Sequence, residues 1–237
     1  MNVLVGTSGW SYKEWKGSFY PAKMPAEDML RFYAGLFPAV EVNNSFYRIP
    51  AERVLAGWAE QVPEQFRFVM KASRRITHNN RLNDEDGSLA YFLRAVNPLG
   101  ARLGPTLFQL PPTLKQDLER LKQFLGKLPK RWPAALEFRH PSWFEEEVYQ
   151  VLRNHGVALA AVDEDEAEGG GPLVPTTDWG YLRMRSTAYD KTALEGWATR
   201  IREQPWREAY VFLKHEDGSP QGPAAAAEMR QILTQSS

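Results

Sequence analysis

The sequence contains no cysteine among its 237 residues. Disulfide bonds, a thiol nucleophile and a thiolate metal site are therefore excluded. It also lacks an excess of either charge, because 29 Lys and Arg residues are balanced by 29 Asp and Glu residues. A basic field over the whole molecule, of the kind that attracts nucleic acid or anionic lipid, is absent, so any anion site has to be local.

Long apolar runs are missing as well. No apolar run approaches the roughly 20 residues that cross a bilayer. The first residues, MNVLVGTSGW, show neither the basic segment nor the long apolar segment of a secretory signal. Because a lack of cysteine also fits a reducing compartment, we expect a cytoplasmic protein that makes no use of a membrane.

Several short signatures of known chemistry do not occur. The glycines at 6–9 do not match the G-x-G-x-x-G turn of an open, doubly wound nucleotide-binding sheet, and neither a Walker loop nor a G-x-S-x-G elbow is present. The His-x-x-x-His spacing, which is typical of metal sites, is absent too. The sequence therefore predicts neither a metal nor a cofactor.

Short apolar runs alternate with amphipathic segments along the whole chain. The runs predict strands at 3–7, 39–43, 67–72, 106–110, 134–139, 157–162, 179–185 and 209–214. The amphipathic segments predict helices that begin at Pro25 and then cover 51–62, 89–103, 118–128, 145–155, 194–201 and 224–233. Ser142 and Glu145 have the spacing of a capping box at the start of the fifth helix.

Eight such units predict a parallel sheet, and their number favours a single-domain (β/α)₈ TIM-type barrel over an open sheet. The domain is expected to span 1–237, with its core at about 3–233. The alternation breaks once, at 163–178, where an acidic and then Gly/Pro-rich segment replaces the helix between strands six and seven.

Polar side chains gather at the predicted carboxyl ends of the strands, where the active sites of such barrels lie. Those expected to point inward are Glu41, Asn43, Lys71, Gln109, Glu137, Arg139, Asp163, Arg183, Arg185 and Lys214. Three carboxylates face five basic residues, so the mouth is expected to be positive although the protein is neutral. Arg183, Arg185 and Lys214 follow strands seven and eight, which often hold phosphate in barrel enzymes. The alternative is that Arg183 or Arg185 forms an ion pair with Glu137 or Asp163.

Two histidines and several aromatic residues extend this set. His140 and His78 follow strands five and three, where each can transfer protons or simply stabilise a turn. Trp10, Tyr47 and Trp143 can stack on a planar or sugar ring, or pack beneath the strand ends. A glycosidase-type pair of Glu41 and Glu137 is disfavoured, because their strands are expected to lie far apart around the barrel.

Five segments resemble a known family. GTSGWSYKEWKGSFYP (6–21), EVNNSFYRIP (41–50), FRFVMKASRRITH (66–78), LGPTLFQLPP (103–112) and LEFRHPSW (136–143) are similar to the YecE-like family, domain of unknown function seventy-two. The resemblance implies a TIM-type barrel related to xylose-isomerase and endonuclease-IV-like barrels. It implies site residues at Glu41, Asn43, Tyr47, Lys71, His78, Gln109, Glu137, Arg139, His140, Trp143 and Asp163. The chain departs from the family pattern at YLRMRS (181–186) and VFLKHED (211–217), where His and Asn positions are not matched.

Two hypotheses for function follow. In the first, the protein is an enzyme, with hydrolysis as one candidate reaction, that acts on a phosphate-bearing or otherwise anionic small molecule or nucleic-acid fragment. Glu137 or Glu41 then serves as general acid or base, assisted by His140, Lys71 and Asp163. In the second, the same basic mouth only binds its anionic ligand or nucleic acid. The oligomeric state and the role of 163–178 are left open.

Overall fold

The computed structural model describes residues 1–163, 171–186, 189–214 and 221–235. Eight parallel strands form a closed barrel in the order of the sequence, with β1 paired to β8. The strands are β1 (Asn2–Ser8), β2 (Ala39–Val42), β3 (Arg67–Lys71), β4 (Leu103–Gln109), β5 (Ala134–Glu137), β6 (Ala158–Asp163), β7 (Trp179–Met184) and β8 (Glu208–Leu213). The predicted single-domain (β/α)₈ TIM-type fold is therefore confirmed.

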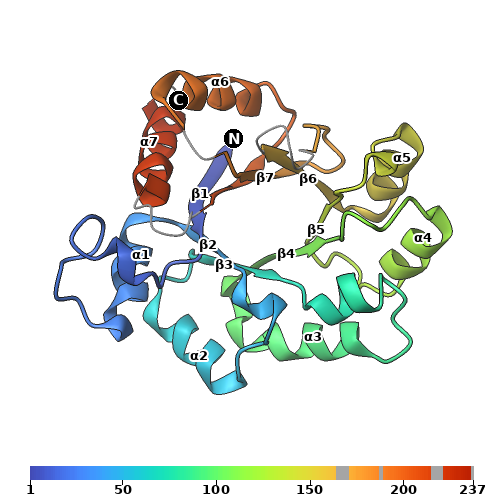
Figure 1. Ribbon diagram of the computed structural model, residues 1–237, viewed down its shortest axis with the longest axis horizontal. Helices are drawn as coiled ribbons and strands as arrows, with labels where there is room; N and C mark the ends of the chain where they lie inside the picture. Colours follow the sequence, from blue (N-terminus) through green and yellow to red (C-terminus); the bar gives the residue numbers. More distant parts are fainter. Residues whose placement is uncertain (164–170, 187–188, 215–220, 236–237) are drawn as a thin grey trace.

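Helices surround the barrel, as Figure 1 shows. They are α1 (Met29–Leu36), α2 (Glu52–Gln61), α3 (Ser88–Val96), α4 (Leu118–Gly126), α5 (Glu146–His155), α6 (Lys191–Arg202) and α7 (Gln221–Gln235). Between β6 and β7, residues 171–178 contain no helix, and 164–170 lie outside the described residues. None of the helices in the described ranges is long and apolar enough to cross a bilayer.

Side chains inside the barrel alternate with those that face the helices. The interior cluster consists of Leu4, Ala39, Val69, Leu107, Ala135, Ala158, Ala160, Tyr181, Tyr210 and Phe212. Aromatic rings from β7 and β8 thus fill the space that alanines on β2, β5 and β6 leave. A barrel of eight strands has an interior just wide enough for such packing, so the polar residues further along the same strand faces lie on top of a filled core.

The junction of β1, β2 and α1 shows how closely the barrel is closed. The Tyr33 hydroxyl accepts a hydrogen bond from the backbone N–H of Thr7 (2.8 Å) and donates one to the carbonyl of Ala39 (3.0 Å). A Cβ added at Gly6 would lie 2.0 Å from the Ala39 oxygen. Only glycine therefore allows β1 and β2 to approach at this point.

Some predicted boundaries were wrong. Ser142 does not cap α5, because it lies in a separate 3₁₀ turn, Pro141–Trp143, and Glu145 occupies the N-cap position. The Ser142 hydroxyl instead accepts a hydrogen bond from the backbone N–H of Gln116. The helix predicted at 89–103 ends at Val96, and a kinked 3₁₀ segment follows, in which Gly100 adopts φ 55°.

Candidate functional site

The candidate site is built on a buried arginine at the carboxyl end of β7. Arg183 Nη2 donates to Glu41 Oε1 at 2.8 Å, and its Nη1 donates to Glu137 Oε2 at 2.6 Å. Neither glutamate has any exposed surface, and only 3% of the arginine is exposed. A single guanidinium thus joins carboxylates from β2 and β5, two strands that were expected to lie far apart around the barrel.

Glu41 receives donors from three further residues. The hydroxyls of Ser8 and Tyr181 donate at 2.8 and 2.7 Å, and the Asn43 amide donates at 2.9 Å. With Arg183, these groups provide four hydrogen bonds to one buried carboxylate. These hydrogen bonds and the charge of Arg183 replace the interactions with water that the carboxylate loses on burial.

Glu137 is connected to Lys71 through an amide. Gln109 donates from Nε2 to Glu137 Oε1 at 2.7 Å, and its Oε1 accepts a hydrogen bond from Lys71 Nζ at 2.8 Å. Arg139 Nε also donates to Glu137, at 3.1 Å. Lys71 Nζ lies 4.3 Å from the centre of the Phe46 ring, a cation–π contact. We call the nine residues Ser8, Glu41, Asn43, Lys71, Gln109, Glu137, Arg139, Tyr181 and Arg183 the barrel-floor network.

Charge keeps both carboxylates ionised. Burial alone would raise the pKa of Glu137, but the charges of Arg183, Arg139 and Arg185 lower it to about 2. Burial acts the same way on Glu41, and there the charge and hydrogen bonds of Arg183 bring the pKa below its ordinary value. The two carboxylates in turn raise the pKa of Arg183. At neutral pH the three residues form a charged unit in which both carboxylates pair with Arg183, while Arg183 Nε is buried without a hydrogen-bond partner among the described residues.

Lys71 differs from the other cations of the network. Burial lowers the pKa of its amine, the Arg183 charge lowers it further, and Glu137 and Glu41 oppose this only in part, so that it lies at about 8. Its hydrogen-bond acceptor, Gln109, is a neutral amide. The neutral form of the Lys71 amine is therefore much closer in free energy to the charged form than it is for an exposed lysine.

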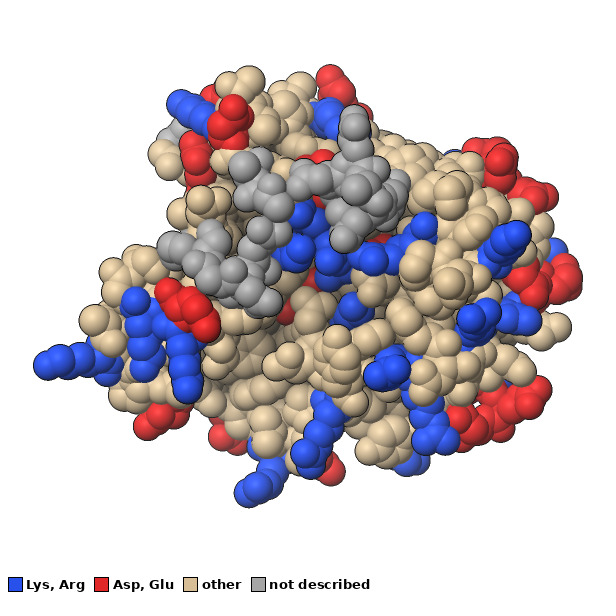
Figure 2. Space-filling view, viewed as in Figure 1, with Lys and Arg blue, Asp and Glu red and all other residues tan. Residues whose placement is uncertain are grey.

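Basic side chains gather above the floor. Arg185 and Lys214 are half-buried at the ends of β7 and β8, and they continue the inward-facing rows of Arg183 and Phe212. Figure 2 shows Lys and Arg side chains collected near the centre of one face, in a hollow with acidic atoms beside them. Among the described residues, five basic side chains of this region accompany the two network carboxylates.

Asp163 was predicted to point into the mouth, and this was wrong. Leu159 and Ala161 share its side of β6 and pack against the helices, whereas Ala158 and Ala160 face the barrel interior. The Asp163 carboxylate accepts a hydrogen bond from the Tyr189 hydroxyl at 2.6 Å. Because side chains alternate along a strand, a residue one position away from an inward-facing site points outward, and this explains the wrong prediction.

The segment after β5 is mainly structural. Trp143 is 1% exposed, stacks on Phe138 with ring centres 4.6 Å apart, and donates from Nε1 to the Leu114 carbonyl at 2.7 Å. It has no surface for a ligand, so its predicted binding role was wrong. His140 Nδ1 accepts a hydrogen bond from the Ser142 N–H at 3.2 Å. This is the turn-stabilising role that the sequence left open for His140.

His78 and Tyr47 both contact the Phe46 ring. The His78 ring lies 4.8 Å from the Phe46 ring, and its Nδ1 shares a hydrogen bond with the Thr77 hydroxyl. Burial and the nearby Lys71 charge lower the pKa of His78, so the neutral imidazole is favoured. Tyr47 is 74% exposed and contacts Phe46 edge to face.

A hollow of about 350 Å³ adjoins the network beside β1 and β2. Asn43, which hydrogen-bonds Glu41, also lines this hollow, together with Trp10, Tyr12 and Trp58. Trp10 packs edge to face on Trp58, with ring centres 4.8 Å apart. Of the three aromatic residues predicted to contact a ligand ring, only Trp10 lines this hollow, which lies on the β1–β2 side of the floor.

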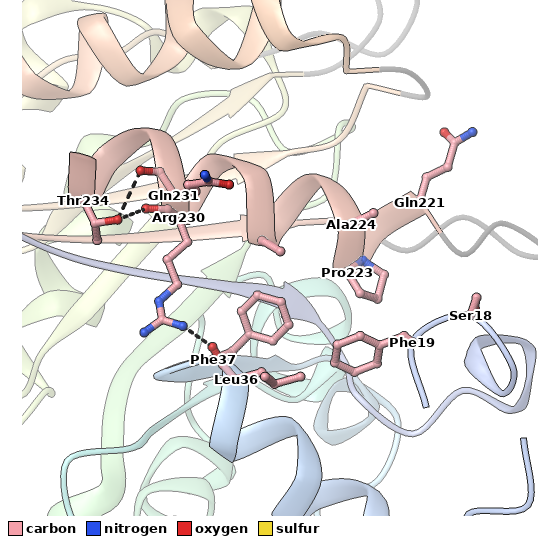
Figure 3. A pocket seen from close by; sticks show the side chains of 11 residues that line it. Ser18, Phe19, Leu36, Phe37, Gln221, Pro223, Ala224, Arg230, Gln231 and Thr234 are labelled. Carbon is pink, nitrogen blue, oxygen red and sulfur yellow. Dashed lines mark hydrogen bonds between the residues drawn. The ribbon is translucent and has the colours of Figure 1, made fainter. Parts of the chain in front are cut away.

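A larger apolar hollow, of about 680 Å³, lies elsewhere, between α7 and the segments at Phe19 and Phe37 (Figure 3). Arg230 reaches across it and donates to the Leu36 carbonyl. No residue of the barrel-floor network lines this hollow. It brings no titratable pair together, so the chemistry of the network takes precedence.

Metal ligands are not assembled in the part of the chain that the structure describes. No group of three His, Asp or Glu side chains there is arranged to hold an ion. The two network carboxylates already bind Arg183.

Three members of the site were missed from the sequence. Tyr181 lies two residues before Arg183, and Ser8 ends β1 on the row of Leu4, so strand alternation could have identified both. Phe46 lies in a 3₁₀ turn, Asn44–Phe46, after β2. No strand pattern indicates that its ring contacts Lys71.

The sequence matches the family described as "Protein of unknown function DUF72" over residues 4–237. It is 28% identical over 234 residues to UPF0759 protein YunF of Bacillus subtilis, covering 90% of this chain and 78% of that protein. It is 30% identical over 176 residues to UPF0759 protein YecE of Escherichia coli K12, covering 72% of this chain and 62% of that protein.

Solved structures give the same result. The crystal structure of a DUF72 family protein from Thermotoga maritima superposes with a TM-score of 0.83 at 29% identity, covering 98% of this chain and 99% of that one. A DUF72 family protein from Enterococcus faecalis shares the fold, with a TM-score of 0.79 at 20% identity, covering 98% of this chain and 95% of that one. With nearly its whole length matched, the chain belongs to the DUF72 family, to which YecE-like proteins are related.

Proposed function

We propose that the protein is an enzyme that binds an anionic small molecule at the carboxyl end of the barrel and uses the neutral amine of Lys71 as its reacting group. The observation that carries this proposal is the environment of that amine. Lys71 is only 9% exposed, and its acceptor is the neutral side chain of Gln109. A buried lysine of this kind is suited to react as a base or nucleophile near neutral pH.

The buried carboxylates are less suited to that task. Glu137 has a pKa of about 2, which makes it a weak base, and it has no surface exposed to a substrate. Glu41 is equally buried and holds four hydrogen bonds. An acid–base enzyme needs a group that accepts a proton near neutral pH, and the Lys71 amine fits that need better than either carboxylate does.

The ligand class follows from the surrounding cations. Arg139 and Arg185 lie close enough for their charges to lower the pKa of Glu137, and an arginine side chain grips carboxylate or phosphate with paired donors. The aromatic hollow at Trp10 and Asn43 would hold a ring attached to the anionic group. A phosphorylated or carboxylated metabolite and a short nucleic-acid fragment both have this chemistry.

The second candidate is a protein that binds the same anion without reaction. It is favoured by the low pKa values of both carboxylates, because an acid–base enzyme commonly holds a carboxyl group whose pKa is raised. Salt dependence separates the ligand types. Affinity for an oligonucleotide would fall steeply with added salt, since counterions are released.

The test begins with thermal shifts measured against inorganic phosphate, phosphate esters and small carboxylates. Compounds that bind are then incubated with the wild type and with Lys71→Met, and turnover is followed by mass spectrometry. We expect Lys71→Met to retain binding and to lose turnover by about 100-fold or more. The matched control is Lys122→Met, which removes an exposed lysine of α4.

The wild-type rate should rise with pH and level off above about 8, because the reacting form of Lys71 is the unprotonated one. Equal turnover by both lysine variants would exclude Lys71 as the reacting group. Binding without any turnover would favour the second candidate, and no binding of any anion would refute both.

A further inference from the structure

We propose that the Lys71 amine forms an imine with an aldehyde or ketone that carries an anionic group. This rests on the proposed function, and it specifies the substrate class as an anionic carbonyl compound. An amine used in this way has to be free of a carboxylate partner, close to positive charge, and sheltered from bulk water. The barrel floor provides each of these conditions through separate residues.

The first condition is met by how the hydrogen bonds are distributed. Both carboxylates near the floor bind Arg183, at 2.8 and 2.6 Å, and one of them also binds Gln109. Gln109 stands between Glu137 and Lys71, so that the amine contacts an amide oxygen in place of a carboxylate. A direct ion pair would hold the lysine in its protonated, unreactive form.

The second condition is met by neighbouring cations. Burial lowers the pKa of the Lys71 amine most, the charges of Arg183 and Arg185 lower it further, and the carboxylates of Glu137 and Glu41 oppose this only in part. The resulting pKa of about 8 agrees with an amine that can react near neutral pH. Burial and the charge of Lys71 lower the pKa of His78. His78 is therefore mostly neutral at neutral pH, and the positive charge near Lys71 comes from the arginines.

The third condition is met by burial against a ring. Phe46 covers the amine from one side at 4.3 Å, and Gln109 holds it from another at 2.8 Å. These contacts fix the direction of the nitrogen before a substrate arrives. Positioning of this kind lowers the entropic cost of bringing two reacting atoms together.

The reaction balances without an oxidant or reductant. The neutral Lys71 nitrogen attacks the carbonyl carbon, a C–N bond forms, the carbonyl π electrons move to oxygen, and one proton passes from nitrogen to that oxygen to give a carbinolamine. The hydroxyl takes up a proton from solvent, the nitrogen lone pair forms the C=N bond as the C–O bond breaks, and water leaves to give the iminium ion. Loss of the remaining nitrogen proton to solvent gives the neutral imine, and the basic residues Arg139 and Arg185 hold the anionic end of the substrate.

The experiment uses the wild-type protein and two small probes, glyoxylate and acetaldehyde. Both carry an aldehyde, but only glyoxylate carries a carboxylate. Sodium cyanoborohydride supplies hydride to trap any imine as a stable secondary amine, and peptide mass spectrometry reports the rate at each lysine. Lys122, which is exposed on α4, is the internal reference.

We expect glyoxylate to label Lys71 at least about ten times faster than Lys122, and inorganic phosphate to slow that labelling. Acetaldehyde should show a clearly smaller preference for Lys71, because it gains from the lowered pKa of the amine but not from the neighbouring cations. Labelling of Lys71 by glyoxylate that is no faster than labelling of Lys122 would overturn the proposal. So would an equal preference by acetaldehyde, because the anionic group would then play no part.

A thermal-shift titration with inorganic phosphate accompanies the labelling. If phosphate binds and turnover depends on Lys71 but no imine is trapped, the imine is refuted while the enzymatic proposal stands, with Lys71 acting as a base. If no anion binds and Lys71 is unreactive, both proposals are refuted.

Discussion

Replacing Arg183 with methionine tests whether the floor depends on one shared cation. The change keeps an unbranched side chain of moderate length but leaves Glu41 and Glu137 buried without their guanidinium partner. Removing one member of a buried ion pair typically costs about 3–5 kcal/mol. The lowering of the Glu137 pKa from 4.5 to about 2 corresponds to roughly 3 kcal/mol of stability at neutral pH, which agrees with that range.

The pH dependence gives the sharper test. In the wild type the pKa of Glu137 is below its unfolded value, so its contribution is complete above pH 4.5 and is lost only as the pH falls towards 2. Stability from this source is thus unchanged between pH 7 and 5. In Arg183→Met, burial raises the pKa of both carboxylates, so that protonation at lower pH stabilises the folded state. The deficit should shrink from pH 7 to pH 5.

Urea unfolding followed by circular dichroism at pH 7 and pH 5 measures both effects. Thermal unfolding should show a decrease of roughly 6–20 °C at pH 7. The matched control is Arg153→Met, which removes an exposed ion pair with Glu146 and should cost less than about 1 kcal/mol. A loss in Arg183→Met as small as in the control, or one that grows from pH 7 to pH 5, would refute the reasoning.

Three further substitutions test the description of the fold and site. Gly180→Ala places a Cβ about 2.4 Å from the Trp206 ring, so we expect a loss of about 1–3 kcal/mol in chemical denaturation. Tyr33→Phe removes the hydroxyl that joins β1 and β2 and leaves a buried N–H unsatisfied, which should cost about 1–3 kcal/mol in the same assay. Trp143→Phe loses the hydrogen bond to the Leu114 carbonyl and should lower stability by about 1 kcal/mol, yet leave phosphate binding unchanged; weaker binding would restore the predicted ligand role.

The barrel was predictable because its signals are local. Each strand is a short apolar run, and each helix repeats apolar residues at helical spacing. Alternation of strands and helices then predicts a parallel sheet. The family resemblance predicted the same architecture. Boundaries were less accurate where chain geometry decides them, as at Gly100, whose φ of 55° interrupts the segment expected to continue as one helix.

The sequence predicted most of the residues that form the site, but it did not predict which of them contact one another. Strand alternation correctly placed Glu41, Lys71, Gln109, Glu137 and Arg183 together on the inner face. It failed for Asp163, because Ala158 and Ala160 face the barrel interior and Asp163 lies on the opposite face of β6. A shift of one residue reverses every side chain, and no local signal fixes it.

The roles of the charged residues were harder to infer. Either Glu137 or Glu41 was expected to act as acid or base, but only the structure shows that one arginine holds both and that an amide lies between Glu137 and Lys71. Which cation pairs with which anion depends on distances across the barrel, and these are not encoded in neighbouring residues.

The contacts of Arg183 also have a consequence for the order of folding. Its partners lie 142 and 46 positions earlier in the chain, on β2 and β5. Until β7 arrives, therefore, Glu41 and Glu137 lack their cation, and a partly folded chain would keep them hydrated or protonated. Contacts between such distant positions form slowly. We expect the mouth of the barrel to mature late, after the apolar interior below it has packed, so that binding competence is acquired in the last stage of refolding.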